Sequence, residues 1–243
     1  MRSIFLSRIF KFMKKIFLVL LLGTMSVACQ SNDDDENSQQ TATYKILSLG
    51  DSYTIGESVC DSCRFPEQLK DSLIQNLTEE ITINLDVVAQ TGWTTTNLKS
   101  AIETADLASE YDLVTLLIGV NNQYQGKPFS LYEEEFPELV NKALEFANND
   151  KSRIIVVSIP DYAFTPFGQN SGNPETTSEE IDMYNAFAED YCNNNNITFI
   201  NITDITREGL NNPDLVASDG LHPSELAYAQ FVQRLLPVAL EKL

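Results

Sequence analysis

Five short apolar segments alternate with longer amphipathic segments along the 243-residue chain, beginning at Tyr44. The short segments are rich in Val, Ile and Leu and span residues 45–49, 81–89, 113–118, 154–159 and 198–202. Such nearly continuous apolarity is typical of strands that are buried on both faces of a parallel sheet. The pattern therefore predicts five parallel strands.

The segments between and after these strands are predicted to be helices, at residues 66–77, 95–108, 131–149, 178–193 and 224–240. Near the first of them, apolar residues recur at a spacing of four, which places them on one face of a helix: Phe65, Leu69, Leu73 and Leu77. Strands that alternate with helices favour an α/β fold with helices on both faces of one sheet. Ligands of such sheets bind at the carboxyl ends of the strands, so we expect a site there.

The longest irregular stretch is residues 160–177, which contains three prolines and two glycines. Loops of this length in compact domains are mostly functional or mobile. Its aromatic residues Tyr162, Phe164 and Phe167 either cover the expected cleft or pack beneath the loop.

Residues 1–28 have the pattern of an export signal. A pair of lysines precedes the apolar run 16–22, and small residues lead to Cys29. This order is typical of a signal peptide, and the run is short for a transmembrane helix. Val27-Ala28-Cys29 resembles a bacterial lipobox, which implies that Cys29 is lipidated after cleavage. The alternative is ordinary secretion with an unmodified Cys29.

Two details bear on this signal. Ser26 stands where the lipobox usually has Leu, and Met13 opens a more typical signal, so Met13 is an alternative start to Met1. Residues 29–43 are predicted to be a flexible tether, because 30–40 contain no apolar residue. The acidic run in this tether resembles the surface-export signal of some bacterial lipoproteins, or it is a plain spacer. We therefore expect a lipid-anchored protein of the cell envelope, in the outer membrane, and exposed on the surface if the acidic run is an export signal.

The charge of the chain excludes several classes of partner. The net charge is −19, and 11 basic residues stand against 35 acidic ones after Cys29. Such a body repels nucleic-acid phosphates, so no nucleic-acid partner is expected. With one histidine and four cysteines, a multi-ligand zinc site is not expected unless carboxylates supply most of the ligands. No organic cofactor is expected either. Nothing in the sequence indicates an oligomeric state.

Polar or small residues follow three of the predicted strands. Ser52, in the triplet Gly-Asp-Ser, follows the first strand, Gly92 follows the second, and Asn121 follows the third. A serine hydroxyl on a strand-to-helix turn is a candidate nucleophile, and a glycine N–H and an asparagine amide are candidate donors to an oxyanion. Each motif by itself is a common turn, so the prediction depends on their occurring together.

His222 is the only histidine, and Asp219 precedes it by three residues. This spacing lets the carboxylate accept the Nδ1 proton of the ring, which leaves Nε2 free to act as a base. A nucleophile, two kinds of oxyanion donor, a base and a carboxylate that orients it are the parts that acyl transfer requires.

With these residues, the chain resembles the SGNH hydrolases, also called GDSL esterases and lipases, over almost all of residues 44–243. The resemblance implies a catalytic triad of Ser52, Asp219 and His222, and an oxyanion hole of the Ser52 N–H, Gly92 and Asn121. It also implies the flavodoxin-like SGNH fold, a three-layer α/β/α sandwich with a five-stranded parallel sheet.

Two positions depart from the commonest pattern of that family. Tyr53 follows the nucleophile where Leu is common, and Asn122 stands where Asp is often found. The second change puts the local hydrogen bonding in question. Trp93, the only tryptophan, is a candidate wall for stacking on a sugar or acyl group, with burial in the core as the alternative. Tyr124 is a second candidate for stacking on a sugar.

Cys60 and Cys63 lie in the loop after the nucleophile. In an oxidising compartment they can form a short disulfide, although the sequence does not determine the distance between their Cα atoms. Cys192 is predicted to be a small buried residue.

Taken together, these observations predict a cell-envelope serine esterase that hydrolyses short, acetyl-type acyl esters on carbohydrate. The segments that flank the nucleophile, 53–64 and 122–130, are mostly polar or small, which favours a short acyl group. A lysophospholipase or thioesterase acting on lipid is one alternative. A non-catalytic binding lipoprotein on the same scaffold is another.

Overall fold

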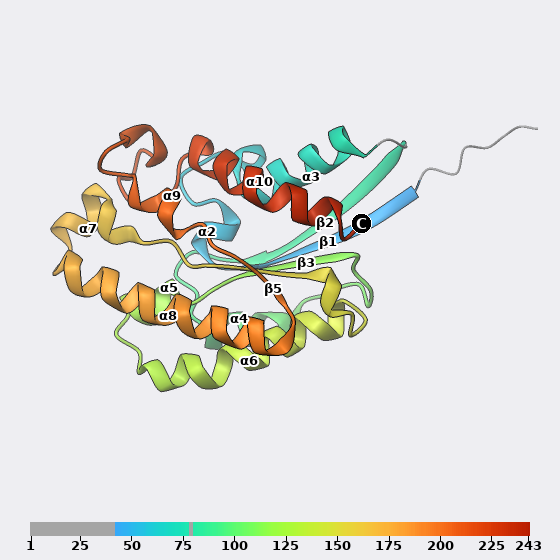
Figure 1. Cartoon of the computed structure of the whole chain (residues 1–243), viewed down its shortest axis with the longest axis horizontal. Helices are drawn as coiled ribbons and strands as arrows, with labels where there is room; N and C mark the ends of the chain where they lie inside the picture. Colours follow the sequence, from blue (N-terminus) through green and yellow to red (C-terminus); the bar gives the residue numbers. More distant parts are fainter. Residues whose placement is uncertain (1–41, 78–79) are drawn as a thin grey trace, which may run out of the picture. The chain divides into compact units, whose positions relative to one another are not determined.

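The computed structural model describes residues 42–77 and 80–243 (Figure 1). The expected signal peptide, Cys29 and the tether up to residue 41 lie outside the described residues. In the part of the chain that is described, no helix is both long and apolar enough to cross a membrane.

The five predicted strands form one parallel sheet. They are β1 (Ala42–Gly50), β2 (Ile81–Ala89), β3 (Leu113–Leu117), β4 (Ile154–Val157) and β5 (Thr198–Ile200). Their order is β2-β1-β3-β4-β5, and each neighbouring pair is parallel. This is the strand order of flavodoxin-like sheets, so the predicted fold class is confirmed.

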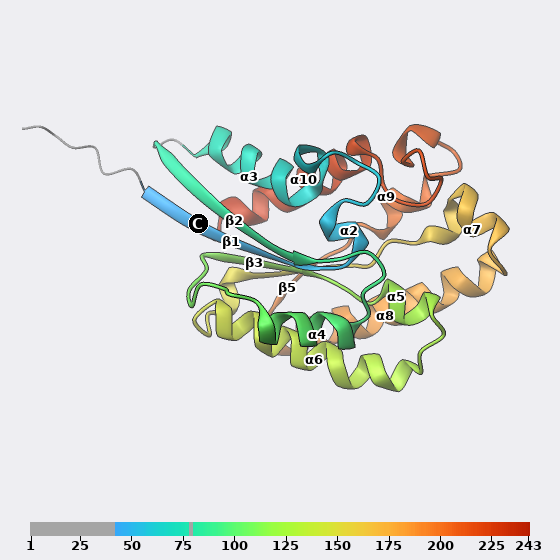
Figure 2. The same ribbon diagram turned by 180° about the vertical axis from the view of Figure 1, so that it is seen from behind.

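Helices cover both faces of the sheet and complete the three layers. In Figures 1 and 2, α3 and α10 lie together on one face, and α4, α6 and α8 lie on the other. The bounds of the helices are α2 (Ser52–Ile55), α3 (Phe65–Asn76), α4 (Thr95–Thr104), α5 (Val120–Tyr124), α6 (Phe129–Phe146), α7 (Pro166–Asn170), α8 (Pro174–Asn195), α9 (Thr203–Arg207) and α10 (Glu225–Leu240).

The structure differs from the expected elements in a few bounds. Strand β4 ends at Val157, two residues before the expected end, although the N–H of Ser158 still bonds to Ile200 O at 3.0 Å. The Ser158 hydroxyl bonds to Thr203 (2.8 Å) and accepts the N–H of Ile202 (2.8 Å). The stretch 160–177 is not irregular throughout, since it contains a short 3₁₀ helix (Tyr162–Phe164), α7 and the start of α8. Strand β1 begins at Ala42, two residues before the expected start of the domain.

The strand order determines where a site can form. The chain moves from β1 outward to β2 and then crosses to β3 on the other side of β1, so the carboxyl ends of β1 and β3 lie side by side. At such a reversal the loops diverge to opposite faces and leave a crevice between them. All five residues of β3 are buried, which holds this edge rigidly in the core.

Candidate active site

The turn after β1 presents Ser52 at the first position of α2. The Asp51 side chain caps this helix by accepting the N–H of Tyr53 at 3.0 Å. The Ser52 N–H lies at the helix start, where N–H groups have no carbonyl partner within the helix. Ser52 is buried, with 3% of its surface exposed. The turn therefore places a hydroxyl and a backbone donor together at the carboxyl end of β1.

Gly92 and Asn121 lie at the ends of the two strands that flank β1. Gly92 has a φ of +84°, which favours glycine, and no atom lies within 4 Å of the position that a Cβ would take. Asn121, in α5, directs its Nδ2 towards Asp51 Oδ2 at 3.4 Å. Gly119 lets the chain turn from β3 into α5, because its φ is +134° and a Cβ would come within 2.6 Å of the Tyr132 ring.

Asp219 and His222 form a tightly bonded pair in the loop before α10. The Nδ1 atom of His222 lies 2.6 Å from Asp219 Oδ2, while Asp219 Oδ1 accepts the N–H groups of Leu221 (2.9 Å) and His222 (3.0 Å). Desolvation raises the pKa of Asp219, but the hydrogen bonds from His222, Ser58 and the backbone outweigh it and lower this pKa to about 2. The carboxylate is therefore charged beside the ring and holds it by Nδ1.

These groups share one pocket with a volume of ≈ 260 Å³. Its lining combines the predicted site residues with aromatic and apolar side chains: Ser52, Tyr53, Thr91, Gly92, Val120, Asn121, Tyr124, Tyr162, Phe167, Leu221 and His222. Among the described residues, no hydrogen bond joins Ser52 Oγ to the His222 ring. Such bonds are commonly long in ligand-free enzymes and tighten when substrate binds.

The aromatic residues around this pocket differ in part from those expected. Tyr162 and Phe167 line it, but Phe164 does not, since it packs below the Arg207 guanidinium at 5.9 Å. Trp93 is outside the lining and packs against the core, so of its two alternatives the structure shows the packing against the core. Tyr124 takes that place at the pocket, with 54% of its surface exposed.

The structure shows the hydrogen bonding of Asn122, which stands where Asp is often found. It is fully buried, and its Oδ1 accepts the N–H of Thr95 (2.9 Å) while its Nδ2 donates to Thr95 Oγ1 (2.7 Å). The Thr95 hydroxyl in turn donates to the buried Glu135. An amide fits here because the position both donates and accepts. Asn122 thus ties the start of α4 to the helix that carries Asn121.

A disulfide joins Cys60 and Cys63, whose Cα atoms are 5.0 Å apart. This separation lies in the usual range for disulfides. Cys192 is buried and free, and burial raises the pKa of its thiol to about 12. The described residues 42–77 and 80–243 contain no group of three or more His, Cys, Asp and Glu side chains arranged to hold a metal ion.

Asp51 is a site residue, whereas its place in the triplet Gly-Asp-Ser predicts only a turn. Desolvation raises its pKa from 3.8 to about 7, against the lowering effect of hydrogen bonds from Tyr53 and Asn121. The residue is completely buried, so the charged form is costly. Its place directly before the nucleophile was the available signal, but its burial depends on the packing of α5 against the turn.

The raised pKa of Asp51 predicts a loss of stability as pH rises. The unfolded chain releases this proton near 3.8 and the folded chain near 7, so the unfolded state binds fewer protons in this window. The free energy of unfolding therefore falls as pH rises through the window and is independent of Asp51 above it. Between about pH 5 and about pH 8 we expect wild type to lose about 3 kcal/mol more than Asp51→Asn. Urea unfolding of both proteins at both pH values measures this. An equal loss of unfolding free energy in wild type and Asp51→Asn would contradict it.

Comparisons with known proteins identify the family and agree with the fold. The family model described as "GDSL-like Lipase/Acylhydrolase family" matches residues 48–230. An acetylxylan esterase from Geobacillus stearothermophilus has a similar structure, with a TM-score of 0.59 and 19% identity over 83% of this chain and 96% of that chain. A lipase/acylhydrolase from Enterococcus faecalis has a TM-score of 0.62 and 18% identity over 82% of this chain and 96% of that chain. A G-D-S-L lipolytic protein from Veillonella parvula has a TM-score of 0.57 and 21% identity over 82% of this chain and 97% of that chain.

No curated protein matches the chain in sequence. At these identities the solved structures are similar in fold, while the family match covers most of the chain, from the end of β1 into α10. The chain belongs to the GDSL-like lipase/acylhydrolase family and is a serine hydrolase that acts on ester bonds.

Proposed function

We propose that Ser52, His222 and Asp219 are the catalytic triad of this hydrolase. The observation that carries the proposal is the shared pocket, into which Ser52 and His222 both project while Asp219 is bonded to the far side of the ring at 2.6 Å. Nε2 of His222 then takes the Ser52 proton as the oxygen attacks the ester carbonyl. The same atom returns the proton to the leaving alcohol, and water releases the acyl group in a second, equivalent step.

The oxyanion of each tetrahedral intermediate is held by three donors. They are the N–H of Ser52, the N–H of Gly92 and the side-chain amide of Asn121. Donors fixed in advance stabilise the developing charge without reorganising during the reaction. The contact between Asn121 Nδ2 and Asp51 (3.4 Å) supports this role, because it fixes the amide while its second hydrogen remains for the substrate.

We propose a short acyl group on a carbohydrate as the substrate. The pocket volume of ≈ 260 Å³ is below the roughly 300–1,000 Å³ that is typical for drug-sized ligands, which supports a small acyl group. Tyr124 makes an edge contact with Tyr162 (5.9 Å, 83°) and remains half-exposed, so it offers a surface on which a sugar ring can stack. The acetylxylan esterase named above supports the same class by analogy of fold.

A lipid ester is the second candidate, and a specific observation favours it. Tyr162, Phe167 and Leu221 give the pocket an apolar wall, and the first two are among the loop aromatics that were candidates to cover the cleft. Residues 166–170 are held over this side by a bond from the Phe167 N–H to Gly220 O at 2.9 Å. An acyl chain that lies along such a wall gains affinity with each buried methylene.

A series of acyl esters from acetate to dodecanoate on one leaving group separates the two candidates. We expect kcat/KM to be highest for acetate or another short ester. A real groove for lipid would instead raise kcat/KM roughly fourfold for each added methylene, from about 0.8 kcal/mol of buried CH₂. A maximum at ten or twelve carbons would reject the short-acyl proposal. In parallel, Tyr124→Ala should lower kcat/KM on an acetylated oligosaccharide and leave kcat/KM on a small chromogenic acetate unchanged.

We also propose that the enzyme is anchored in the cell envelope through lipid on Cys29. Support comes from the sequence: the short apolar run, the small residues before Cys29 and the acidic tether after it. A tethered esterase would act on polymers at the cell surface.

Cys29→Ala is expected to abolish incorporation of labelled lipid and to move the protein from the membrane fraction to the soluble fraction. The reason is that no other thiol stands at the signal-peptide junction. Lipid labelling of cells that express wild type or variant measures this. Unchanged labelling in the variant would contradict the anchor, and loss of labelling in Cys192→Ala, a control thiol, would show that the assay does not report on Cys29.

A further inference from the structure

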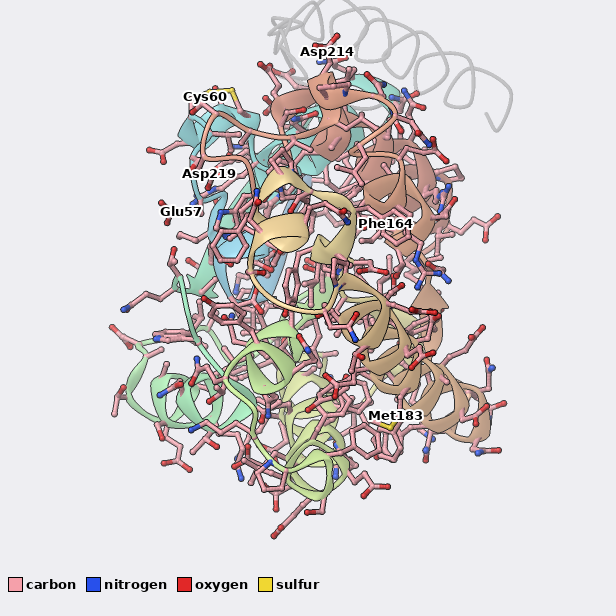
Figure 3. All side chains as sticks on the ribbon, turned by 90° about the vertical axis from the view of Figure 1, so that its left-hand side faces the viewer. Glu57, Cys60, Phe164, Met183, Asp214 and Asp219 are labelled. Carbon is pink, nitrogen blue, oxygen red and sulfur yellow. A yellow bond between two sulfur atoms is a disulfide. The ribbon has the colours of Figure 1, made fainter. Side chains whose placement is uncertain are left out.

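The segment 56–64, here called the nucleophile loop, connects Ser52 to α3 and contacts two other loops of the site. Glu57 accepts a hydrogen bond from Thr91, the residue before Gly92. Ser58 Oγ donates to Asp219 Oδ2 at 2.7 Å. The Cys60–Cys63 disulfide closes the loop two residues after Ser58. Figure 3 shows Glu57, Cys60 and Asp219 on the same side of the molecule.

The contact of Ser58 completes the bonding of the Asp219 carboxylate. Oδ1 of Asp219 accepts two backbone N–H groups, at 2.9 Å from Leu221 and 3.0 Å from His222. Oδ2 accepts His222 Nδ1 at 2.6 Å and the Ser58 hydroxyl at 2.7 Å. The Asp219 side chain is 30% exposed, so without Ser58 the second lone pair of Oδ2 would turn to water.

The backbone of Ser58 adopts an uncommon conformation. Its φ is +67°, in the left-handed region that costs energy for a residue with a Cβ. Conformations of this kind persist where the surrounding structure requires them, and they gather at functional sites. Ser58 is exposed and stands at the third position of the turn 56–59, which the Val59 N–H closes on Gly56 O at 3.2 Å, a position where a positive φ occurs. The turn directs the Ser58 hydroxyl to Asp219, 161 residues away in sequence.

We propose that Ser58 is a positioning residue for ester hydrolysis, which holds the Asp219 carboxylate in the orientation that receives the His222 Nδ1 proton. The inference rests on the proposed triad and adds a fourth side chain to it. Ser58 lies outside the pocket lining, so it acts through Asp219 and His222 and does not touch the substrate. A carboxylate that is fixed on all sides keeps the ring aligned when His222 becomes charged in the transition state.

Three substitutions of Ser58 test the role with a built-in control for folding. Ser58→Ala and Ser58→Gly both remove the hydroxyl, but glycine adopts the positive φ without strain, so its melting temperature should equal or exceed that of wild type. Both variants are expected to lower kcat on an acetate ester about 10-fold and to leave KM within about twofold. Ser58→Asn tolerates this φ and carries an amide donor, so it should recover part of kcat. Ser62→Ala, an exposed serine of the same loop, is the matched control.

The labelling rate of Ser52 by a fluorophosphonate gives a readout that does not depend on the ester chosen. It should fall in Ser58→Ala and Ser58→Gly by a factor similar to that for kcat. The Nδ1 proton of His222 gives a spectroscopic readout, because the chain without a histidine tag has a single histidine. Its NMR resonance should move in Ser58→Ala and stay in place in Ser62→Ala.

The outcomes separate this inference from the proposed triad. Wild-type kcat in both Ser58→Ala and Ser58→Gly, or a change confined to KM, would overturn the positioning role while leaving the triad intact. An active Asp219→Ala or an unlabelled wild type would overturn the triad, and the His222 resonance would still decide whether Ser58 acts on the Asp219–His222 pair. A loss of kcat that follows the melting temperature across the Ser58 variants would assign Ser58 a structural role only.

Discussion

Ser52→Ala is expected to lower kcat/KM for ester hydrolysis by about 10⁴- to 10⁶-fold. The substitution removes the proposed attacking oxygen from a buried residue, of which only 3% of the surface is exposed. It deletes one hydroxyl and leaves no large cavity, so the fold should be retained. Steady-state kinetics on a chromogenic acetate ester, with a melting curve for each preparation, measures the effect.

The members of the proposed triad are expected to act as a unit, which gives a second test. His222→Ala should lose a similar factor, and the double variant should lose little beyond either single one, because a base without its nucleophile contributes nothing. Asp219 is ionised at neutral pH because hydrogen bonds lower its pKa to about 2. Near wild-type kcat in Ser52→Ala, with Ser62→Ala as the control serine, would show that another residue is the nucleophile.

Asn121→Ala is expected to lower kcat by about 10²- to 10³-fold and to change KM little. In the proposed mechanism the Asn121 amide stabilises the charge that develops in the transition state, so its loss should slow the chemical step. Asn121→Asp should cost more, because it places a second carboxylate beside the buried Asp51 at the position where the oxyanion forms. Kinetics on the same acetate ester measures both variants.

Two asparagines provide controls for Asn121. Asn76→Ala, on the exposed side of α3, should leave both kcat and the melting temperature unchanged. Asn122→Ala should lower the melting temperature, because it leaves the buried N–H and hydroxyl of Thr95 without their partner. An Asn121→Ala variant within threefold of wild-type kcat would remove Asn121 from the oxyanion hole.

The sequence alone determined the strands, their parallel arrangement and the edge at which chemistry occurs. Runs of Val, Ile and Leu indicate burial on both faces, and the expected bounds of β2 agree with the structure at both ends. The positions of Ser52, Gly92 and Asn121 after their strands follow from the same local pattern. These features depend on residues close together in the chain, which is why a linear pattern is enough to find them.

The lining of the pocket was decided by tertiary structure. Trp93 and Tyr124 both follow strands, and the sequence offered no means to choose between them. In the folded chain Trp93 packs against the core, while α5 carries Tyr124 to the mouth of the pocket beside Phe167, whose ring is 6.1 Å away. The choice depends on the angle at which short helices leave the sheet, and no periodicity encodes that angle.

The charges and contacts that tune the site were also decided only by packing. Asp51 has a raised pKa because α5 and the turn after β1 bury it completely, and Ser58 reaches Asp219 across 161 residues of chain. The distance of 5.0 Å between the Cα atoms of Cys60 and Cys63 likewise follows from the path of the loop. Periodic burial is a local property that sequence patterns record, whereas desolvation and side-chain bonds between distant loops arise only when the sheet brings those loops together.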